Sequence, residues 1–260
     1  NISFDYAYEP IREIGGDYVH VHECERTGAV TVTLLDVAGH GLAAALTVNR
    51  LFGELERIRA ENAEAEPGEV MSLLNRYIYL TMARHSLYAT GACMMLDPHT
   101  GVLRWVNAGH PPALLRRRNG DVESLDTTTF ILGAVGPAGF DPEQRETTLE
   151  PGEAVIAHTD GLHEAKDRQG RQFGLDRVRE TACFDPPPRS WPRFFSNAVQ
   201  KHHHGLADDD VLIASLVLHK LRIAEGSSAE VSTGTAGPSE ADAADAEAER
   251  ELESSGSYSL

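Results

Sequence analysis

The chain has 260 residues, of which 41% are hydrophobic and 24% charged, so it can form one large globular domain or two smaller ones. Its formal net charge of −17 argues against nucleic acid or an anionic membrane surface as a partner, because both require clustered Lys and Arg. No apolar run approaches the roughly 20 residues that span a bilayer, so we expect no membrane insertion of this segment. Cys24, Cys93 and Cys183 lack metal-ligand spacing, which favours free thiols in a reducing compartment and therefore the cytoplasm.

Alternating apolar and polar residues predict three strands near the N-terminus, over residues 2–10, 15–24 and 29–37. Because these strands follow one another directly, we expect an antiparallel meander. A second group of strands is predicted further along the chain, over residues 89–97, 101–109, 112–118, 153–159 and 211–218.

Two helices are predicted between these groups, over residues 42–62 and 68–84. Pro67 and Gly68 separate them, so we expect the helices to be antiparallel neighbours. The apolar stripe of the first helix consists of Leu42, Leu46, Leu51, Leu55 and Ile58. Two groups of strands with attached helix pairs indicate an α+β layered sandwich.

The two ends of the chain have a different character. Residues 221–260 are acidic and rich in Ala, Ser and Gly, so we expect a disordered tail after a folded domain over residues 1–220. The sequence starts at Asn1 without a Met and enters strand-like sequence almost at once. We therefore expect that a further domain precedes this segment.

Aspartates lie at the ends of four predicted strands. Asp17 follows two glycines, Asp36 ends the third strand, Asp160 follows the strand over 153–159, and residues 208–210 are three aspartates before the last strand. One such aspartate is commonly a helix cap, and Asp36 could cap the helix that follows it. Four such aspartates together favour a cation-binding site, because clustered carboxylates repel one another unless positive charge balances them. Oxygen ligands without sulfur favour Mg²⁺ or Mn²⁺ over zinc.

Six motifs in order carry a family resemblance: "EIGGDY", "LLDVAGHGLAAAL", "NAGHPPALL", "PGEAVIAHTDGLHEA", "FGLDRV" and "DDDV". Together they resemble the SpoIIE-type branch of the PP2C-like, metal-dependent protein phosphatases (the PPM family), over residues 3–219. The resemblance implies a four-layer α-β-β-α sandwich with two central antiparallel sheets flanked by helix pairs. It also implies two Mn²⁺ or Mg²⁺ ions with a nucleophilic water between them.

Carried over to this chain, the resemblance implies five metal ligands: the side chains of Asp17, Asp36, Asp160 and Asp209 and the backbone carbonyl of Val37. Asp36 would bridge the two ions and is the predicted catalytic residue. The last ligand is ambiguous, since "ADDDVL" offers Asp208 as an alternative register and has Leu212 where the family usually has Thr.

Other polar residues in these motifs receive structural interpretations. We expect His40 to bond local backbone and His110 to fix a turn before two prolines. The run at residues 202–204 is expected to be a solvated helix end, because consecutive helical residues point in different directions. Arg12 is the nearest candidate for a phosphate-binding arginine, although a surface position is the simpler interpretation.

By resemblance, the substrate is a phosphoserine or phosphothreonine protein, typically a STAS-domain anti-sigma factor antagonist in a bacterial partner-switching pathway. Relatives often carry an N-terminal sensor domain, and the helix pair at about 42–84 is where such proteins are thought to receive regulation. Two alternatives stay open: a pseudophosphatase scaffold that binds a signalling partner, and a hydrolase of small phosphoesters.

Overall fold

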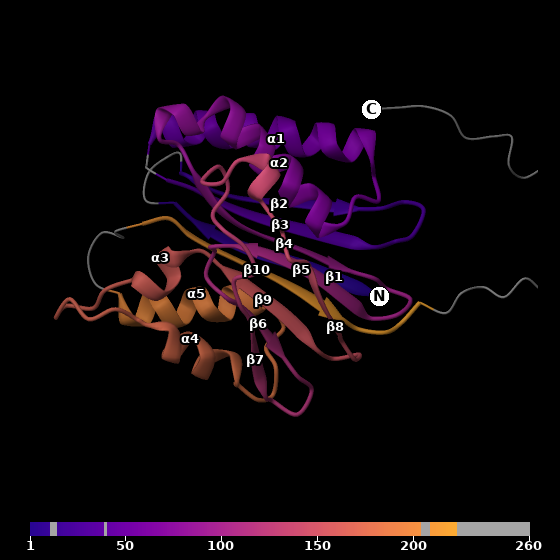
Figure 1. Cartoon of the computed structure of the whole chain (residues 1–260). Coiled ribbons are helices and arrows are strands. Elements are labelled where there is room, and N and C mark those ends of the chain that lie inside the picture. Colours follow the sequence, from indigo (N-terminus) through magenta and orange to yellow (C-terminus); the bar gives the residue numbers. More distant parts are fainter. Residues whose placement is uncertain (11–14, 39–40, 204–208, 223–260) are drawn as a thin grey trace, which may run out of the picture. The chain divides into compact units, whose positions relative to one another are not determined.

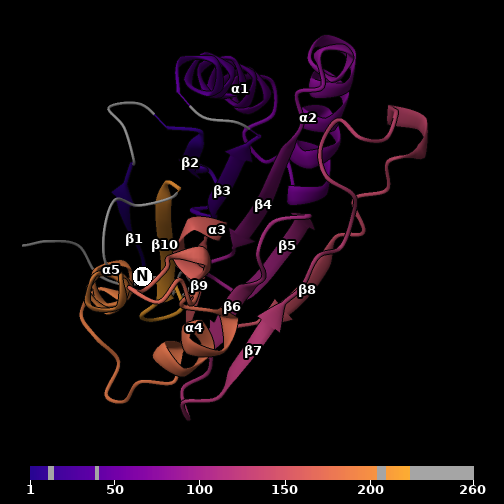
Figure 2. The ribbon, with the colours of Figure 1, turned by 90° about the vertical axis from the view of Figure 1, so that its left-hand side faces the viewer.

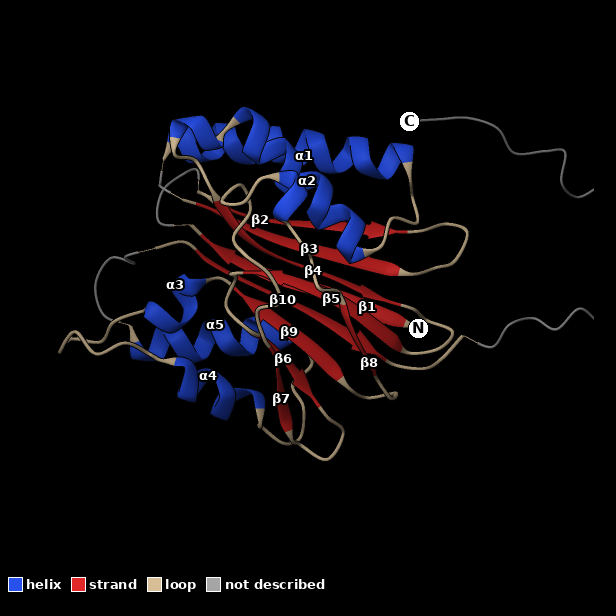
Figure 3. Ribbon diagram, viewed as in Figure 1, coloured by secondary structure: helices blue, strands red, loops and turns tan. Residues whose placement is uncertain are grey.

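Two five-stranded antiparallel sheets form the centre of the protein, in a computed structural model that describes residues 1–10, 15–38, 41–203 and 209–222 (Figures 1 and 3). Sheet A has the order β1 (Ile2–Glu9), β10 (Val211–Leu218), β9 (Ala154–His158), β6 (Ala113–Arg116), β7 (Val122–Leu125). Sheet B has the order β2 (Asp17–Glu23), β3 (Val30–Val37), β4 (Ala89–Leu96), β5 (Val102–Ala108), β8 (Arg145–Thr148).

Helices cover the outer face of each sheet, as Figure 2 shows. Sheet B carries α1 (Leu42–Glu61) and α2 (Pro67–Thr81). Sheet A carries α3 (Asp160–Glu164), α4 (Leu175–Ala182) and α5 (Trp191–His202). The predicted four-layer α-β-β-α sandwich of the α+β class is therefore confirmed. No helix in the described ranges is long and apolar enough to cross a membrane.

The core between the two sheets follows the period-2 pattern of the strands. In β3, Val32 and Leu34 enter this inner core, whereas Leu35 and Val37 pack under α1 and α2. In β10 the even-numbered residues from Leu212 to Leu218 face inward. Polar residues that occupy the next inward-facing positions, just beyond the apolar ones, therefore point into one end of the space between the sheets.

The predicted three-strand meander is wrong for its first strand. β2 and β3 do pair antiparallel, but β1 pairs with β10, with Ile2 opposite Leu218 and Glu9 opposite Val211. β1 is thus an edge of sheet A, and the short segment between β1 and β2 links one sheet to the other. The alternation of apolar and polar residues predicts that a segment forms a strand. It does not predict which strand it pairs with, because that partner can lie at any distance along the chain.

The predicted stripe on α1 is correct only in its second half. Leu51, Leu55 and Ile58 are fully buried against sheet B. Leu42 and Leu46 are 66% and 58% exposed, because they lie on the side of the helix opposite Leu51 and Leu55, whereas Ala44 and Thr47 of the same turns are buried. The other predicted strands and helices are observed within a few residues of their predicted bounds, while β7 and β8 were not predicted.

The predicted tail over 221–260 lies outside the described residues from residue 223 onward. The domain boundary after residue 220 therefore stays a prediction.

Candidate metal centre

Asp17 and Asp36 lie directly opposite each other on adjacent strands. Asp17 is the first residue of β2 and pairs in register with Asp36, near the end of β3. Both occupy inward-facing positions, since Val19 two residues along β2 and Leu34 two residues back on β3 pack in the inter-sheet core. Like charges placed directly opposite destabilise a sheet, so this pairing is costly unless a cation or a proton neutralises it.

Asp17 is buried and incompletely hydrogen-bonded. It is 9% exposed, and its interaction with the Thr159 side chain lowers its pKa in part. Its Oδ2 is buried without a hydrogen-bond partner within the described residues. Burial, together with the charges of Asp36 and Asp210, raises the pKa of Asp17 to about 9. A buried carboxylate oxygen with no donor is a position that a metal ion can fill.

Asp36 is half-buried and is surrounded by further acids. Burial, followed by the charges of Asp160, Asp209 and Asp210, raises the pKa of Asp36 to about 7. Asp160, Asp209 and Asp210 all belong to segments next to strands of sheet A, whereas Asp36 is on sheet B. Carboxylates of both sheets therefore interact at this end of the sandwich.

The remaining predicted ligands lie around the same pair. Asp160 is the first residue of α3, with Thr159 as N-cap residue, and burial and the charge of Glu164 raise its pKa. Asp209 is exposed, two residues before β10, and Asp208 lies outside the described residues. Val37 is buried at the end of β3, and its N–H donates to the Gly16 carbonyl at 3.2 Å.

These residues fit a hard cation by donor chemistry, though they are not arranged as a finished cage. All the predicted donors are oxygens, which suits Mg²⁺ or Mn²⁺. Among the described residues, no three Asp, Glu, His or Cys side chains form a group that could hold an ion as they stand. The predicted ligands thus share one end of the sandwich, and their joint coordination of metal stays a prediction.

Three side chains near Asp17 were not predicted to take part. Asp210 is 6% exposed, and its Oδ2 accepts a hydrogen bond from Gly16 N at 2.8 Å. Tyr8 hydrogen-bonds to Asp210. Thr159 is fully buried beside Asp17 and Asp210. The sequence signal for Asp210 was its place directly before a strand, but nothing local distinguished it from its two aspartate neighbours.

A cavity of about 300 Å³ opens beside Asp36 and Asp160. His110 lines it and is 2% exposed, with Nδ1 3.0 Å from Thr90 Oγ1, and its backbone N–H donates to Asn107 Oδ1 at 2.8 Å. These contacts agree with the structural role expected for His110.

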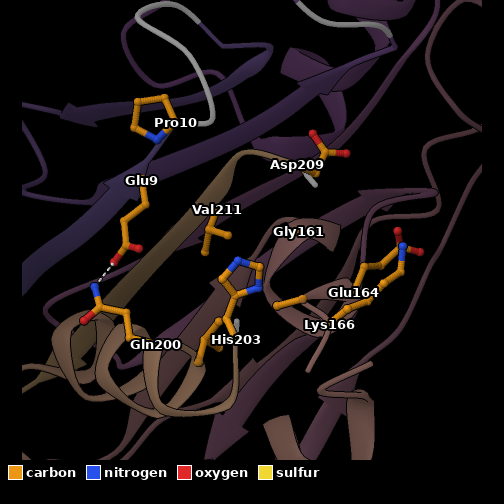
Figure 4. A pocket seen from close by; sticks show the side chains of 11 residues that line it. Glu9, Pro10, Gly161, Glu164, Lys166, Gln200, His203, Asp209 and Val211 are labelled. Atoms are coloured by element: carbon orange, nitrogen blue, oxygen red, sulfur yellow. Dashed lines mark hydrogen bonds between the residues drawn. The ribbon is translucent and has the colours of Figure 1, made fainter. Parts of the chain in front are cut away.

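A second cavity, of about 210 Å³, is lined in part by Asp209 (Figure 4). Val211 contributes to its apolar wall, and the ring of His203 points into it. Gln200 closes one side by donating to Glu9 Oε1 at 3.0 Å. The cavity places a partly apolar surface next to the predicted metal ligands.

Other expectations have mixed outcomes. Gly41 is the N-cap residue of α1, so Asp36 is not its cap. His202, expected to be solvated, is half-buried, because its ring packs edge-on against Phe173 and its Nε2 lies 3.0 Å from the Arg171 carbonyl oxygen. Arg12 and His40 lie outside the described residues.

The architecture is that of the PP2C phosphatases. The PP2C phosphatase domain of SpoIIE from Bacillus subtilis superimposes with a TM-score of 0.71 at 16% sequence identity, covering 84% of this chain and 62% of that one. At this identity the likeness concerns the fold.

The chain belongs to the stage II sporulation protein E (SpoIIE) family, which matches residues 26–219. It is 29% identical to the phosphoserine phosphatase RsbP of Bacillus subtilis over 168 residues, covering 62% of this chain and 40% of RsbP. It is 23% identical to the phosphoserine phosphatase RsbU of the same organism over 209 residues, covering 78% of this chain and 60% of RsbU. The chain therefore spans less than two thirds of these relatives.

Proposed function

We propose that the chain is a metal-dependent protein serine/threonine phosphatase with two Mn²⁺ or Mg²⁺ ions. The observation that carries this proposal is the register pair of Asp17 and Asp36, in which Asp17 Oδ2 is buried without a donor. Membership in a family whose relatives include two phosphoserine phosphatases supports it.

Each predicted ligand has a distinct place in this proposal. Asp36 of sheet B, whose pKa is raised by the charges of three acids attached to sheet A, would hold both ions, and Asp17, Asp160, Asp209 and the Val37 carbonyl would complete their coordination. Bound ions of this kind lower the pKa of water and stabilise the charge of a transferring phosphoryl group. The cavity beside Asp36 and Asp160 provides room for the phosphoryl group.

The proposed substrate is a phosphoserine or phosphothreonine on a STAS-domain anti-sigma factor antagonist. RsbP and RsbU are named as phosphoserine phosphatases, and the second cavity offers a surface for polypeptide next to Asp209. We place the reaction in the cytoplasm, with an N-terminal sensor domain as the source of its input.

The test measures phosphate release from a phosphorylated STAS-domain protein and from an aryl phosphate, with Mn²⁺, Mg²⁺ or EDTA. Asp36→Asn keeps the shape of the side chain and removes its charge. We expect metal-dependent release by the wild type and a loss of at least about 100-fold in the variant, because several kcal/mol of transition-state stabilisation depends on the metals.

Three other outcomes would each point elsewhere. Release from the aryl phosphate alone would favour a hydrolase of small phosphoesters. Mn²⁺ binding by calorimetry without turnover would favour a pseudophosphatase or a domain that needs its regulator. Absence of metal binding would contradict the proposal.

A further inference from the structure

We propose that Tyr8, Thr159 and Asp210 of sheet A form a clamp that positions the predicted metal ligand Asp17 of sheet B. This inference rests on the proposed function, because it concerns how the same metal centre is held. The three clamp residues touch Asp17 or the backbone before it, so they are positioning residues.

The direct contact of the clamp comes from Thr159. This residue is fully buried, and its Oγ1 accepts a hydrogen bond from Leu212 N at 3.0 Å. The Thr159 side chain also interacts with the Asp17 carboxylate and opposes the rise in the pKa of that group. The same Oγ1 donates to the Asp210 carbonyl oxygen at 3.5 Å. Thr159 thus links Asp17 to the backbone of Asp210, and within the described residues Asp17 Oδ2 is buried without a hydrogen-bond partner.

The indirect contact passes through the backbone before Asp17. Asp210 Oδ2 accepts from Gly16 N at 2.8 Å, and the Tyr8 side chain hydrogen-bonds to Asp210. The Gly16 carbonyl in turn accepts from Val37 N, whose own carbonyl is a predicted ligand. Gly16 is thus held on one side by sheet A and on the other by β3.

Gly15 shows how closely these groups approach. A Cβ atom added there would lie 2.0 Å from both Tyr8 Oη and Asp210 Oδ2, so only glycine leaves room for the contact. Tyr8 Oη and Asp210 Oδ2 therefore both lie close to the backbone at Gly15, and Asp210 Oδ2 also bonds the next residue, Gly16.

The contacts lie on inward-facing positions of three sheet A segments. Tyr8 packs against the inter-sheet core from β1, Thr159 follows β9, and Asp210 precedes β10. Because Asp17 is on β2, the geometry of a ligand on one sheet is set by side chains of the other. Loss of such outer contacts typically weakens metal affinity 10-fold to 100-fold.

The experiment compares Mn²⁺ affinity by calorimetry for the whole 260-residue chain. Thr159→Val removes the hydroxyl at nearly constant volume, and Thr159→Ser retains it. We expect Thr159→Val to bind Mn²⁺ about 10-fold to 100-fold more weakly, and Thr159→Ser to stay within about threefold of the wild type. Tyr8→Phe, which keeps the ring, should give a smaller loss in the same direction.

Thr33→Val is the matched control. Thr33 is equally buried and donates to Cys93 Sγ at 3.3 Å, but it lies on the outer face of β3, away from the clamp. We expect unchanged Mn²⁺ affinity, with any loss confined to the thermal unfolding midpoint measured in EDTA.

Wild-type Mn²⁺ affinity in both Thr159→Val and Tyr8→Phe would overturn the clamp, while turnover by those variants would leave the proposed function intact. Mn²⁺ binding by the wild type without phosphate release would contradict the proposed function alone, because the affinity comparison still decides the clamp. If Thr159→Val fails to fold in EDTA, the Mn²⁺ affinity of Tyr8→Phe, compared with that of the wild type, decides whether the clamp acts on the metal site. Absence of Mn²⁺ binding by the wild type would overturn both.

Discussion

The surroundings of the Asp17 carboxylate disfavour its ionised form. It is 9% exposed, faces Asp36 across the strand pair, and has one oxygen without a donor among the described residues. Isolation of a carboxylate from water is unfavourable unless a proton or a cation compensates. Without metal, a proton on Asp17 offsets this cost, because the interaction with Thr159 is too small to prevent the rise in its pKa.

This leads to a prediction on stability in EDTA. The folded pKa of Asp17 is about 9 against 3.8 when unfolded, so between these values the folded state holds a proton that the unfolded state lacks. The free energy of unfolding should therefore fall as pH rises, by up to about 1.4 kcal/mol per pH unit for this group. Thermal unfolding of the wild type and Asp17→Asn from pH 7 to pH 9 should show a steeper loss in the wild type.

The range above pH 7 is chosen because buried histidines act in the opposite direction. Burial lowers the pKa of His110 to about 3 and that of His158 to about 4. Below about pH 6.5 the unfolded state therefore binds protons on these histidines that the folded state does not, and the free energy of unfolding falls as the pH falls. Parallel pH profiles of the wild type and Asp17→Asn above pH 7 would contradict the raised pKa of Asp17.

Asp17 and Asp36 could be predicted because each lies at the end of a strongly patterned strand in a recognisable motif. Asp210 could not be distinguished from Asp208 and Asp209, since three consecutive aspartates carry no local information about which one is buried. Thr159 and Tyr8 were missed for another reason: their roles depend on contacts between segments about 140 and 10 residues away from Asp17 along the chain.

At the scale of elements, apolar pattern predicted where strands and helices form better than what they contact. β10 was predicted at its observed bounds, whereas β1 was assigned to the wrong sheet. The stripe predicted on α1 joined two different faces of the helix: Leu46 and Leu55 are two and a half turns apart and lie on opposite sides, and the sheet packs against the side of Leu55.

This difference along α1 can be measured. Leu55→Ala should lower the free energy of unfolding by about 2 to 5 kcal/mol, because it opens a cavity in the core under the helix. Leu46→Ala, the matched change at a 58% exposed site, should change it by less than about 0.5 kcal/mol. Urea denaturation of the two variants provides the comparison, and equal losses would contradict the observed burial.

At the scale of the whole described domain, the predicted ligands belong to both halves of the sandwich. Asp17 and Asp36 are on sheet B, and Asp160 and Asp209 are on segments attached to sheet A. Metal binding would therefore tie the two sheets together at one end.

We expect Mn²⁺ at 100 times its dissociation constant to stabilise the folded state by about 2.7 kcal/mol for a single site. Amide exchange should slow in both β2 and β10, since both flank the ligands. Asp36→Asn should lose both effects. Slower exchange confined to one sheet would contradict ligation from both.

The pairing of the first strand with the last also constrains how the chain folds. Most of sheet B, from β2 to β5, consists of neighbours along the chain, so it can form from local contacts early. β1 has to wait for β10, about 200 residues later, and until then both β1 and β9 have unpaired edges. During synthesis, the segments that carry the predicted metal ligands are accordingly among the last to come together, and a nascent chain released before residue 211 exposes unpaired strand edges that favour aggregation.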